Sequence, residues 1–265
     1  MADRVVVVGG GLAGLAAAAA LAEHADVRVI ERLPAPGGTW EFDHPAVKTL
    51  VAECLQRGVT LECGDTALRW VDRRLLVIGP GRREWVAAGH LVFAGGTRPA
   101  TPAELPLLGA RTAGVFVATV AHHLLTGRVD LGAHVALCGG GYWAELVSSH
   151  LPSGTHVTFI GDGPAPRPSA GVSLSTLRGH TPVEVTGHDR VETLVTDAGG
   201  RRATLRCDAV VLAGDIRPLR NVDGAIREAP DVTYVQLAAA TVSAPEVVEH
   251  ARKSVSALTT NEENP

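Results

Sequence analysis

Short runs of apolar, β-branched residues alternate along the chain with longer segments that favour a helix. Residues 5–8 form an uninterrupted apolar run, residues 12–22 are apolar and rich in alanine, and residues 27–30 form a second short run that is apolar except for Arg28. Short apolar runs are typical of strands buried on both faces of a parallel sheet, whereas a longer alanine-rich segment favours a helix. The order predicts a βαβ unit at the start of the chain.

A second part of the chain repeats this pattern. Residues 134–138 are an apolar run that we interpret as a strand, with helices expected over residues 114–125 and 145–151. Shorter elements are expected elsewhere: a helix over 44–55, strands over 59–63, 75–78, 188–196, 203–208 and 232–241, and a closing helix over 246–258. Glycine-rich breaks around the strands at 59–63 and 75–78 predict a small meander.

The turn after the first strand has the spacing of a dinucleotide-binding loop. It reads G-x-G-x-x-G between a strand and a helix, and a carboxylate ends the following strand. Glycines let the backbone approach a pyrophosphate, the helix amino terminus supplies N–H groups and positive dipole, and the acid accepts a hydrogen bond from a ribose hydroxyl. These features predict an adenine-nucleotide site made by Gly9, Gly11, Leu12, Ala13, Gly14, Glu31 and Arg32.

The second βαβ pattern carries a related turn. Gly139, Gly141 and Ala144 give G-x-G-x-x-A between a strand and a helix. Tyr142 and Trp143 lie inside this pattern, where such bulk either stacks on a ligand or blocks a cofactor. The sequence leaves both interpretations open.

The second turn has no carboxylate at the equivalent strand end. The step that separates Gly9 from Glu31, counted from Gly139, leads to Gly161. Asp162 is a substitute in the next position, and Arg167 is the nearest arginine for a 2′-phosphate. The sequence therefore does not decide between NAD and NADP.

Composition limits the classes of partner. The 265 residues are 46% hydrophobic and 20% charged, with a formal net charge of -4, so a basic surface for nucleic acid or an anionic membrane is not indicated. Residues 5–22 are apolar, but three successive glycines would break a membrane-spanning helix. We therefore expect a soluble, cytoplasmic protein that binds a small-molecule nucleotide.

Cysteines and histidines give no metal or disulfide pattern. Cys54, Cys63, Cys138 and Cys207 form no C-x-x-C pair, so a disulfide framework, a zinc site and a redox-active dithiol are all unsupported. Free thiols suit a reducing compartment. The neighbours His122 and His123 would point about 100° apart on a helix and would not converge on one ion.

Two further segments carry a resemblance to a known family. Residues 37–40 read Gly-Gly-Thr-Trp soon after the acid, and residues 90–99 form an apolar strand followed by Ala-Gly-Gly-Thr-Arg-Pro. Together with the two glycine turns, they resemble the two-dinucleotide-domain flavoproteins related to glutathione reductase. That resemblance implies FAD at the first turn, with contributions from Gly38, Thr39, Trp40, Ala94 and Gly95. It implies NAD(P)H at the second turn, with Gly139, Gly141, Tyr142 and Trp143.

A finer resemblance comes from the second half of the chain. The segment at 114–125 and the strand that starts after Cys207-Asp208 look most like the α subunits of heteromeric amine and amino-acid dehydrogenases, including hydrogen cyanide synthase and sarcosine oxidase relatives. One departure is that Leu237-Ala238 stand where that family has a Gly-Asp pair that reaches FAD. Trp40 is either close to the flavin ring or a packing anchor.

We therefore expect an α/β protein with two Rossmann-like three-layer dinucleotide-binding domains, the second inserted into the first. The FAD-binding domain would comprise residues 1–103 and 215–265, and the NAD(P)-binding-like domain residues 104–214. The expected function is an FAD-dependent oxidoreductase that passes electrons between NAD(P)H or a partner subunit and an acceptor, or a small amine or amino-acid substrate. The alternative is a degenerate, non-catalytic nucleotide-binding subunit of an oxidoreductase complex. A partner subunit or a homo-oligomer is compatible with either.

Overall fold

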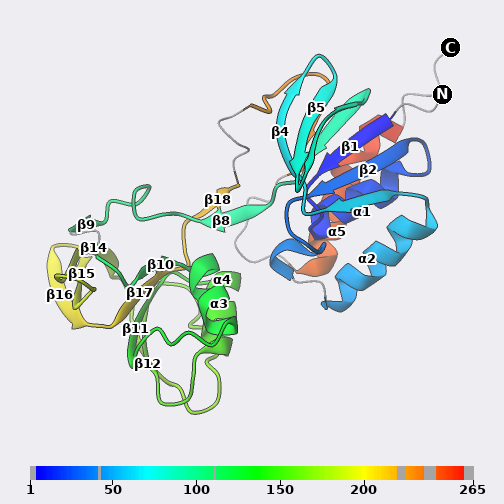
Figure 1. Cartoon of the computed structure of the whole chain (residues 1–265). Helices are drawn as coiled ribbons and strands as arrows, with labels where there is room; N and C mark the ends of the chain where they lie inside the picture. Colours follow the sequence, from blue (N-terminus) through cyan, green and yellow to red (C-terminus); the bar gives the residue numbers. More distant parts are fainter. Residues whose placement is uncertain (1–3, 41–42, 110–111, 220–224, 236–242, 260–265) are drawn as a thin grey trace. The chain divides into compact units, whose positions relative to one another are not determined.

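The chain folds into two compact units, shown in Figure 1. This computed structural model describes residues 4–40, 43–109, 112–219, 225–235 and 243–259. Unit 1 comprises residues 1–97, 218–238 and 242–265, and unit 2 comprises residues 98–217 and 239–241. Segments from both ends of the sequence therefore build unit 1.

Unit 1 is built on a five-stranded parallel sheet. In spatial order its strands are β19 (Val232–Tyr234), β7 (His90–Phe93), β1 (Arg4–Val8), β2 (Asp26–Glu31) and β3 (Thr60–Cys63). Val8 pairs with Ile30 on one side and with Phe93 on the other, so these three strands end at the same edge. The first glycine turn begins directly after Val8, at the carboxyl edge of the sheet.

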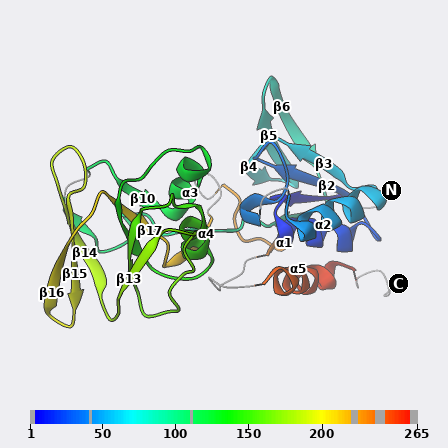
Figure 2. The same ribbon diagram turned by 90° about the horizontal axis from the view of Figure 1, so that it is seen from below.

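The sheet of unit 1 is covered on both faces. Alternate strand residues such as Val5 and Val7 pack against three helices, α1 (Leu12–Leu21), α2 (Pro45–Gln56) and α5 (Ala244–Thr259). Val6 and Val8 pack on the other face, against an antiparallel meander. Its strands are β4 (Thr66–Val71), β5 (Arg74–Gly79) and β6 (Arg82–Ala87). Figure 2 shows α5 and the meander on opposite sides of the sheet.

Ion pairs join the inner side of the meander to the edge of the sheet. Arg28 of β2 binds Glu62 of β3 and, at 3.2 Å, Glu84 of β6. Arg82 of β6 binds Glu62 at 2.6 Å and Asp65 at 2.8 Å. Burial opposes the ionised form of Glu62, but hydrogen bonds from Arg28 and Arg82 outweigh it and lower the pKa of that carboxyl. The cluster fixes which side of β6 faces the sheet.

Unit 2 repeats the three-layer arrangement. Its parallel sheet has the order β10 (Val115–Val117), β17 (Ala209–Leu212), β11 (His134–Cys138), β12 (His156–Ile160) and β13 (Ser173–Leu177). Helices α3 (Ala118–Thr126) and α4 (Tyr142–His150) cover one face. Residues of a second sheet pack on the other face; that sheet consists of β16 (Arg201–Arg206), β15 (Thr193–Ala198), β14 (Thr181–Thr186) and β9 (Leu108–Gly109).

Three short elements complete the described chain. They are the 3-10 turn η1 (Gly38–Trp40) and the paired strands β8 (Thr97–Pro99) and β18 (Ile216–Pro218). Among the described helices, none combines the length and the apolar character needed to cross a membrane.

The predicted fold class is confirmed, and four element predictions are wrong. Residues 59–63, expected in the small meander, form β3 of the parallel sheet, and the strand expected from residue 188 begins at Thr193 as β15. Residues 115–117, expected at the start of a helix, form β10 because their apolar side chains pair in parallel with Val210–Leu212. Helix α4 begins at Tyr142 rather than at residue 145. Leu237-Ala238, where we expected a departure from the family, lie outside the described residues.

Candidate functional site

Two glycines of the first turn are required by the packing of the protein itself. Gly9 has a φ of +104°, and a Cβ atom there would lie 2.3 Å from the carbonyl oxygen of Ala94. A Cβ atom on Gly14 would lie 1.8 Å from the carbonyl oxygen of Gly9. The first glycine therefore allows the tight turn beside β7, and the third allows α1 to pack against it.

Gly11 differs from these two positions because a Cβ atom there would meet no clash. Its φ is -74°, which any residue adopts, and the nearest heavy atom to a Cβ there would be the carbonyl oxygen of Gly37 at 3.7 Å. Gly11 is also the N-cap of α1, which begins without a side-chain cap hydrogen bond. The first turn is thus an open cradle at a helix amino terminus, the arrangement that suits a pyrophosphate.

The segment at 37–40 lies directly against this turn. The Gly37 amide donates to the carbonyl oxygen of Gly10 at 2.8 Å, and Gly11 and Gly37 form an isolated parallel bridge. A Cβ atom on Gly38 would lie 3.5 Å from the Cα of Gly11, so Gly38 and the exposed Thr39 are brought to the cradle. Two predicted segments that are more than twenty residues apart in sequence therefore meet.

Trp40 is placed as a packing residue. It is partly buried against the helical core of unit 1, and its ring lies 4.9 Å from the ring of His44 in an edge arrangement. His44 caps α2 by accepting a hydrogen bond from the amide of Ala46. The sequence left open whether Trp40 lies close to the flavin ring or anchors the loop by packing. Its position in the structure favours the packing role.

Glu31 is buried beside the turn with both carboxylate oxygens already in use. It is 7% exposed, and it accepts hydrogen bonds from the Gly10 amide at 2.5 Å and from the Leu33 amide at 2.7 Å. Each oxygen keeps a second lone pair, so a ribose hydroxyl can still donate to the carboxylate. Glu31 therefore shapes the turn in addition to its predicted contact, whereas Arg32 is exposed.

The Glu31→Ala substitution is expected to weaken both the fold and nucleotide binding. Removing the carboxylate leaves two backbone amides without their acceptor, which costs about 1–3 kcal/mol of unfolding free energy. Urea denaturation of the ligand-free variant measures this loss, and FAD titration measures the loss of affinity. The control is Arg83→Ala, at an exposed position of β6 outside the turn, which should change neither. An unfolding free energy and an FAD affinity equal to those of the native chain would contradict the role given to Glu31.

The end of β7 forms the third side of the first turn. The Ala94 amide donates to the carbonyl oxygen of Val8 at 2.8 Å, which extends the pairing of β7 with β1. A Cβ atom on Gly95 would lie 2.7 Å from the ring of Phe93, so this position has no room for a side chain unless the ring moves. Ala94 and Gly95 are therefore beside the turn, as the resemblance implied.

The second turn is similar at its first glycine and different at its second, because Gly141 has a φ of +85° where Gly11 has -74°. Gly139 has a φ of +89°, and a Cβ atom there would lie 2.3 Å from the backbone of Gly214. Gly141 is the N-cap of α4, so Tyr142 and Trp143 are the first residues of the helix and do not belong to the loop. Trp143 is 5% exposed within the core of unit 2, and the Tyr142 ring lies 5.4 Å from its ring. The ligand-stacking interpretation is therefore not supported for Trp143.

Strand register identifies Gly161 as the position in unit 2 that is equivalent to Glu31. Val8 precedes Gly9 and pairs with Ile30, and Glu31 follows Ile30. In the same way, Cys138 precedes Gly139 and pairs with Ile160, and Gly161 follows Ile160. A Cβ atom on Gly161 would lie 3.2 Å from Cζ of Phe159, and one on Gly140 would lie 3.6 Å from the same atom. The buried Phe159 ring thus lies beside the space that an acid would need. Sequence reasoning missed this residue, whose one signal was an aromatic side chain one position before the strand end.

Asp162, the proposed substitute for that acid, is engaged in local structure. Asp162 accepts a hydrogen bond from the amide of Gly179 at 2.7 Å, and its carbonyl oxygen accepts one from Arg178 at 3.2 Å. Arg167 is exposed, and its amide donates to Glu145 at 2.9 Å. The carboxylate of Asp162 thus already accepts a hydrogen bond, whereas the exposed side chain of Arg167 is not held by the bond of its amide.

The four cysteines are free and poorly suited to thiolate chemistry. Burial raises the pKa of the Cys54 and Cys207 thiols to about 11. Burial also raises the pKa of Cys138 and, together with the nearby carboxylates, that of Cys63. Cys63 is the one exposed member of the set. Because the thiolate is the reactive form, none of these thiols is an activated nucleophile.

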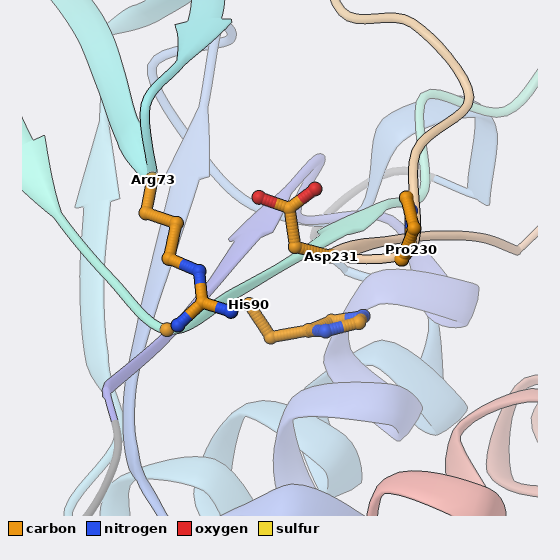
Figure 3. Close-up of a pocket in the computed structure, with 5 residues that line it drawn as sticks. Arg73, His90, Pro230 and Asp231 are labelled. Atoms are coloured by element: carbon orange, nitrogen blue, oxygen red, sulfur yellow. The ribbon is translucent and has the colours of Figure 1, made fainter.

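A cavity of about 320 Å³ lies elsewhere in unit 1, as shown in Figure 3. It is lined by Arg73, Gly89, His90, Pro230 and Asp231. His90 is the first residue of β7 and pairs with Val5, so the cavity is at the amino edge of the sheet. Parallel α/β sheets bind nucleotides at the carboxyl edge, and the cavity is therefore not part of the nucleotide site.

The chain belongs to the pyridine nucleotide-disulphide oxidoreductase family, whose model matches residues 3–221. Members of this family use FAD and NAD(P)H, which confirms the cofactors expected for the two turns at the level of the family. The residues of the first turn fit FAD: an open cradle at Gly11, an uncapped helix and a buried acid are all present.

Similar proteins include a curated relative and two solved structures. The NAD(P)H coenzyme A polysulfide/persulfide reductase of Pyrococcus horikoshii is 28% identical, over 82% of this chain and 55% of the relative. A reduced CoADR-RHD of Bacillus anthracis has a TM-score of 0.68 at 13% identity, covering 100% of this chain and 58% of that one. Thioredoxin reductase of Lactococcus lactis has a TM-score of 0.64 at 14% identity, covering 97% and 98%.

These comparisons support the broader of the two resemblances. The curated relatives are named for sulfur chemistry, so the finer likeness to amine dehydrogenase α subunits is not shared by them. The chain also spans about half the length of the curated relatives it matches, 55% and 54%.

Proposed function

We propose that the chain is an FAD-dependent electron-transfer protein that binds FAD at the first turn and NAD(P)H at the second. The cradle at Gly11 carries this proposal, because that glycine is the one in the turn whose side-chain space the protein leaves open. Bound FAD would supply the redox chemistry by accepting a hydride from NAD(P)H. The chain itself binds the pyrophosphate through the start of α1 and positions the ribose through Glu31.

The electron acceptor proposed here is not a cysteine of the chain. The raised thiol pKa values and the absence of a C-x-x-C pair leave no dithiol and no activated thiolate to relay electrons. Electrons would therefore pass from the flavin to a partner subunit or directly to a small acceptor. The relative's name suggests sulfur compounds as acceptors, and the finer resemblance suggests amines or amino acids as donors.

Anaerobic reduction of the FAD-loaded protein tests this proposal. NADH or NADPH is expected to bleach the visible flavin band. A relay thiol would act after the flavin is reduced, so the thiol-free route is tested at the next step: reduced Cys63→Ser should be reoxidised at the native rate by added polysulfide, the acceptor class in the relative's name. Loss of this reoxidation in a folded, flavin-loaded Cys63→Ser protein would overturn the thiol-free route.

A degenerate nucleotide-binding subunit is the second candidate. It is favoured by Leu237-Ala238 in place of Gly-Asp in the sequence and by Phe159 beside the position of the ribose acid in unit 2. The same experiment separates the two candidates. A protein that holds FAD but is reduced by neither NADH, NADPH nor an added amino acid would support the subunit role.

A further inference from the structure

The outer side of the meander in unit 1 is a face separate from the first glycine turn. We define the meander face by six residues that point away from the sheet: Arg69, Arg74, Leu76, Ile78, Arg83 and Trp85. Leu76 pairs with Arg69 on one side and Trp85 on the other, and Ile78 pairs with Arg83. Strand alternation places all six on the side opposite the buried Leu75 and Val77.

The centre of the meander face is apolar and exposed. Trp85 is 40% exposed and Ile78 is 38% exposed, and they are among the few large apolar side chains of the described chain with this exposure. The Arg74 guanidinium carbon lies 5.7 Å from the centroid of the Trp85 ring. Tryptophan and arginine at such a centre are the residues that most often carry binding energy in protein interfaces.

The charge on this face has one sign. Arg69, Arg74 and Arg83 are exposed and form no ion pair with any residue that the structure describes. The one acidic residue of the three strands, Glu84, points inward and is bound by Arg28 and Arg82. Arg82, on the inner side of β6, is thus neutralised by its acidic neighbours, while the three outer arginines are available to a partner.

We propose that the meander face docks a partner protein whose surface carries carboxylates around apolar side chains. The chain has a formal net charge of -4, so a general attraction to nucleic acid or anionic lipid is not expected, and three separated arginines favour discrete carboxylates. This proposal does not depend on the bound cofactor or on the electron-transfer role.

The size of the face predicts a transient contact. Each strand has six residues, which gives a length of about 20 Å, and three strands span about 10 Å between their axes. The resulting area of about 200 Å² is well below the roughly 800 Å² per partner of a stable interface. The meander face is therefore the anchor of a weak, salt-sensitive complex.

A labelled peptide of alternating glutamate and leucine is the probe for this surface. Its fluorescence anisotropy with the full chain should show binding at low salt that weakens about tenfold or more at high salt. The triple substitution Arg69→Gln, Arg74→Gln, Arg83→Gln should abolish binding, and Trp85→Ala should weaken it about tenfold. A matched control changes the three exposed arginines of β16, Arg201, Arg202 and Arg206, to glutamine and should leave binding intact.

Three results would overturn the proposal. One is equal loss of binding in the β16 control, and another is equal binding of a peptide with lysine in place of glutamate. The third is tighter, face-dependent binding of single-stranded RNA or of phosphatidylserine vesicles than of the acidic peptide. Far-ultraviolet circular dichroism of each variant measures whether its fold is retained. We expect that it is, because all the substituted side chains are exposed.

Discussion

The Gly11→Val variant is expected to fold like the native chain and to bind no FAD. The side chain at this position has open space in the protein, since the nearest atom to its Cβ is 3.7 Å away and the φ of -74° suits valine. The same space is the approach of the pyrophosphate to the start of α1. The cost to folding should be about 1 kcal/mol, because valine is a poor N-cap residue.

The control for this variant is Gly163→Val in the loop after β12. Gly163 also has open space around it and no positive φ, so valine there should affect neither folding nor FAD. FAD titration by flavin fluorescence and urea denaturation are measured on both proteins. Stoichiometric FAD in a folded Gly11→Val protein would remove the first turn from the binding site.

The Gly14→Ala substitution is expected to cost the most stability of any single methyl addition in the first turn. The added carbon would lie 1.8 Å from the carbonyl oxygen of Gly9 and 3.4 Å from Cβ of Ala94, so α1 must move away from the turn. Overpacking costs about 1–3 kcal/mol and sometimes more. We expect a loss of about 3 kcal/mol, with FAD binding lost as the turn shifts.

The second turn offers the matched comparison for Gly14→Ala. Its equivalent position already holds Ala144, which is 1% exposed, so the methyl group fits there. Ala144→Gly should therefore cost only about 1 kcal/mol through backbone entropy in the helix. Equal denaturation midpoints for native protein and Gly14→Ala would show that the helix does not pack on the turn as described.

The first half of the site could be predicted because its signals are local. The apolar run at 5–8, the three glycines and the acid at Glu31 follow one another in sequence, and each has a fixed geometric consequence in a βαβ unit. The contact between Gly11 and Gly37 spans a longer separation and was not predicted; the resemblance implied only that Gly38, Thr39 and Trp40 contribute to the same site.

Other features depend on tertiary packing that a sequence pattern does not carry. Residues 115–117 become a strand because Val210–Leu212 lie beside them, although the apolar pattern continues directly into a helix. Phe159 could not be assigned beside the second turn, since a buried strand residue gives no sign of which glycine its ring edge will meet. The extra hydrogen bonds of Glu31 to Gly10 and Leu33 likewise depend on the exact turn geometry.

The central claim is that this chain holds FAD at its first glycine turn. The most direct measurement is the visible absorbance spectrum of the purified native chain after incubation with FAD and desalting, followed by mass identification of the released nucleotide. We predict a protein-bound flavin spectrum with stoichiometric FAD. A folded chain that elutes without flavin after incubation with saturating FAD would contradict the claim.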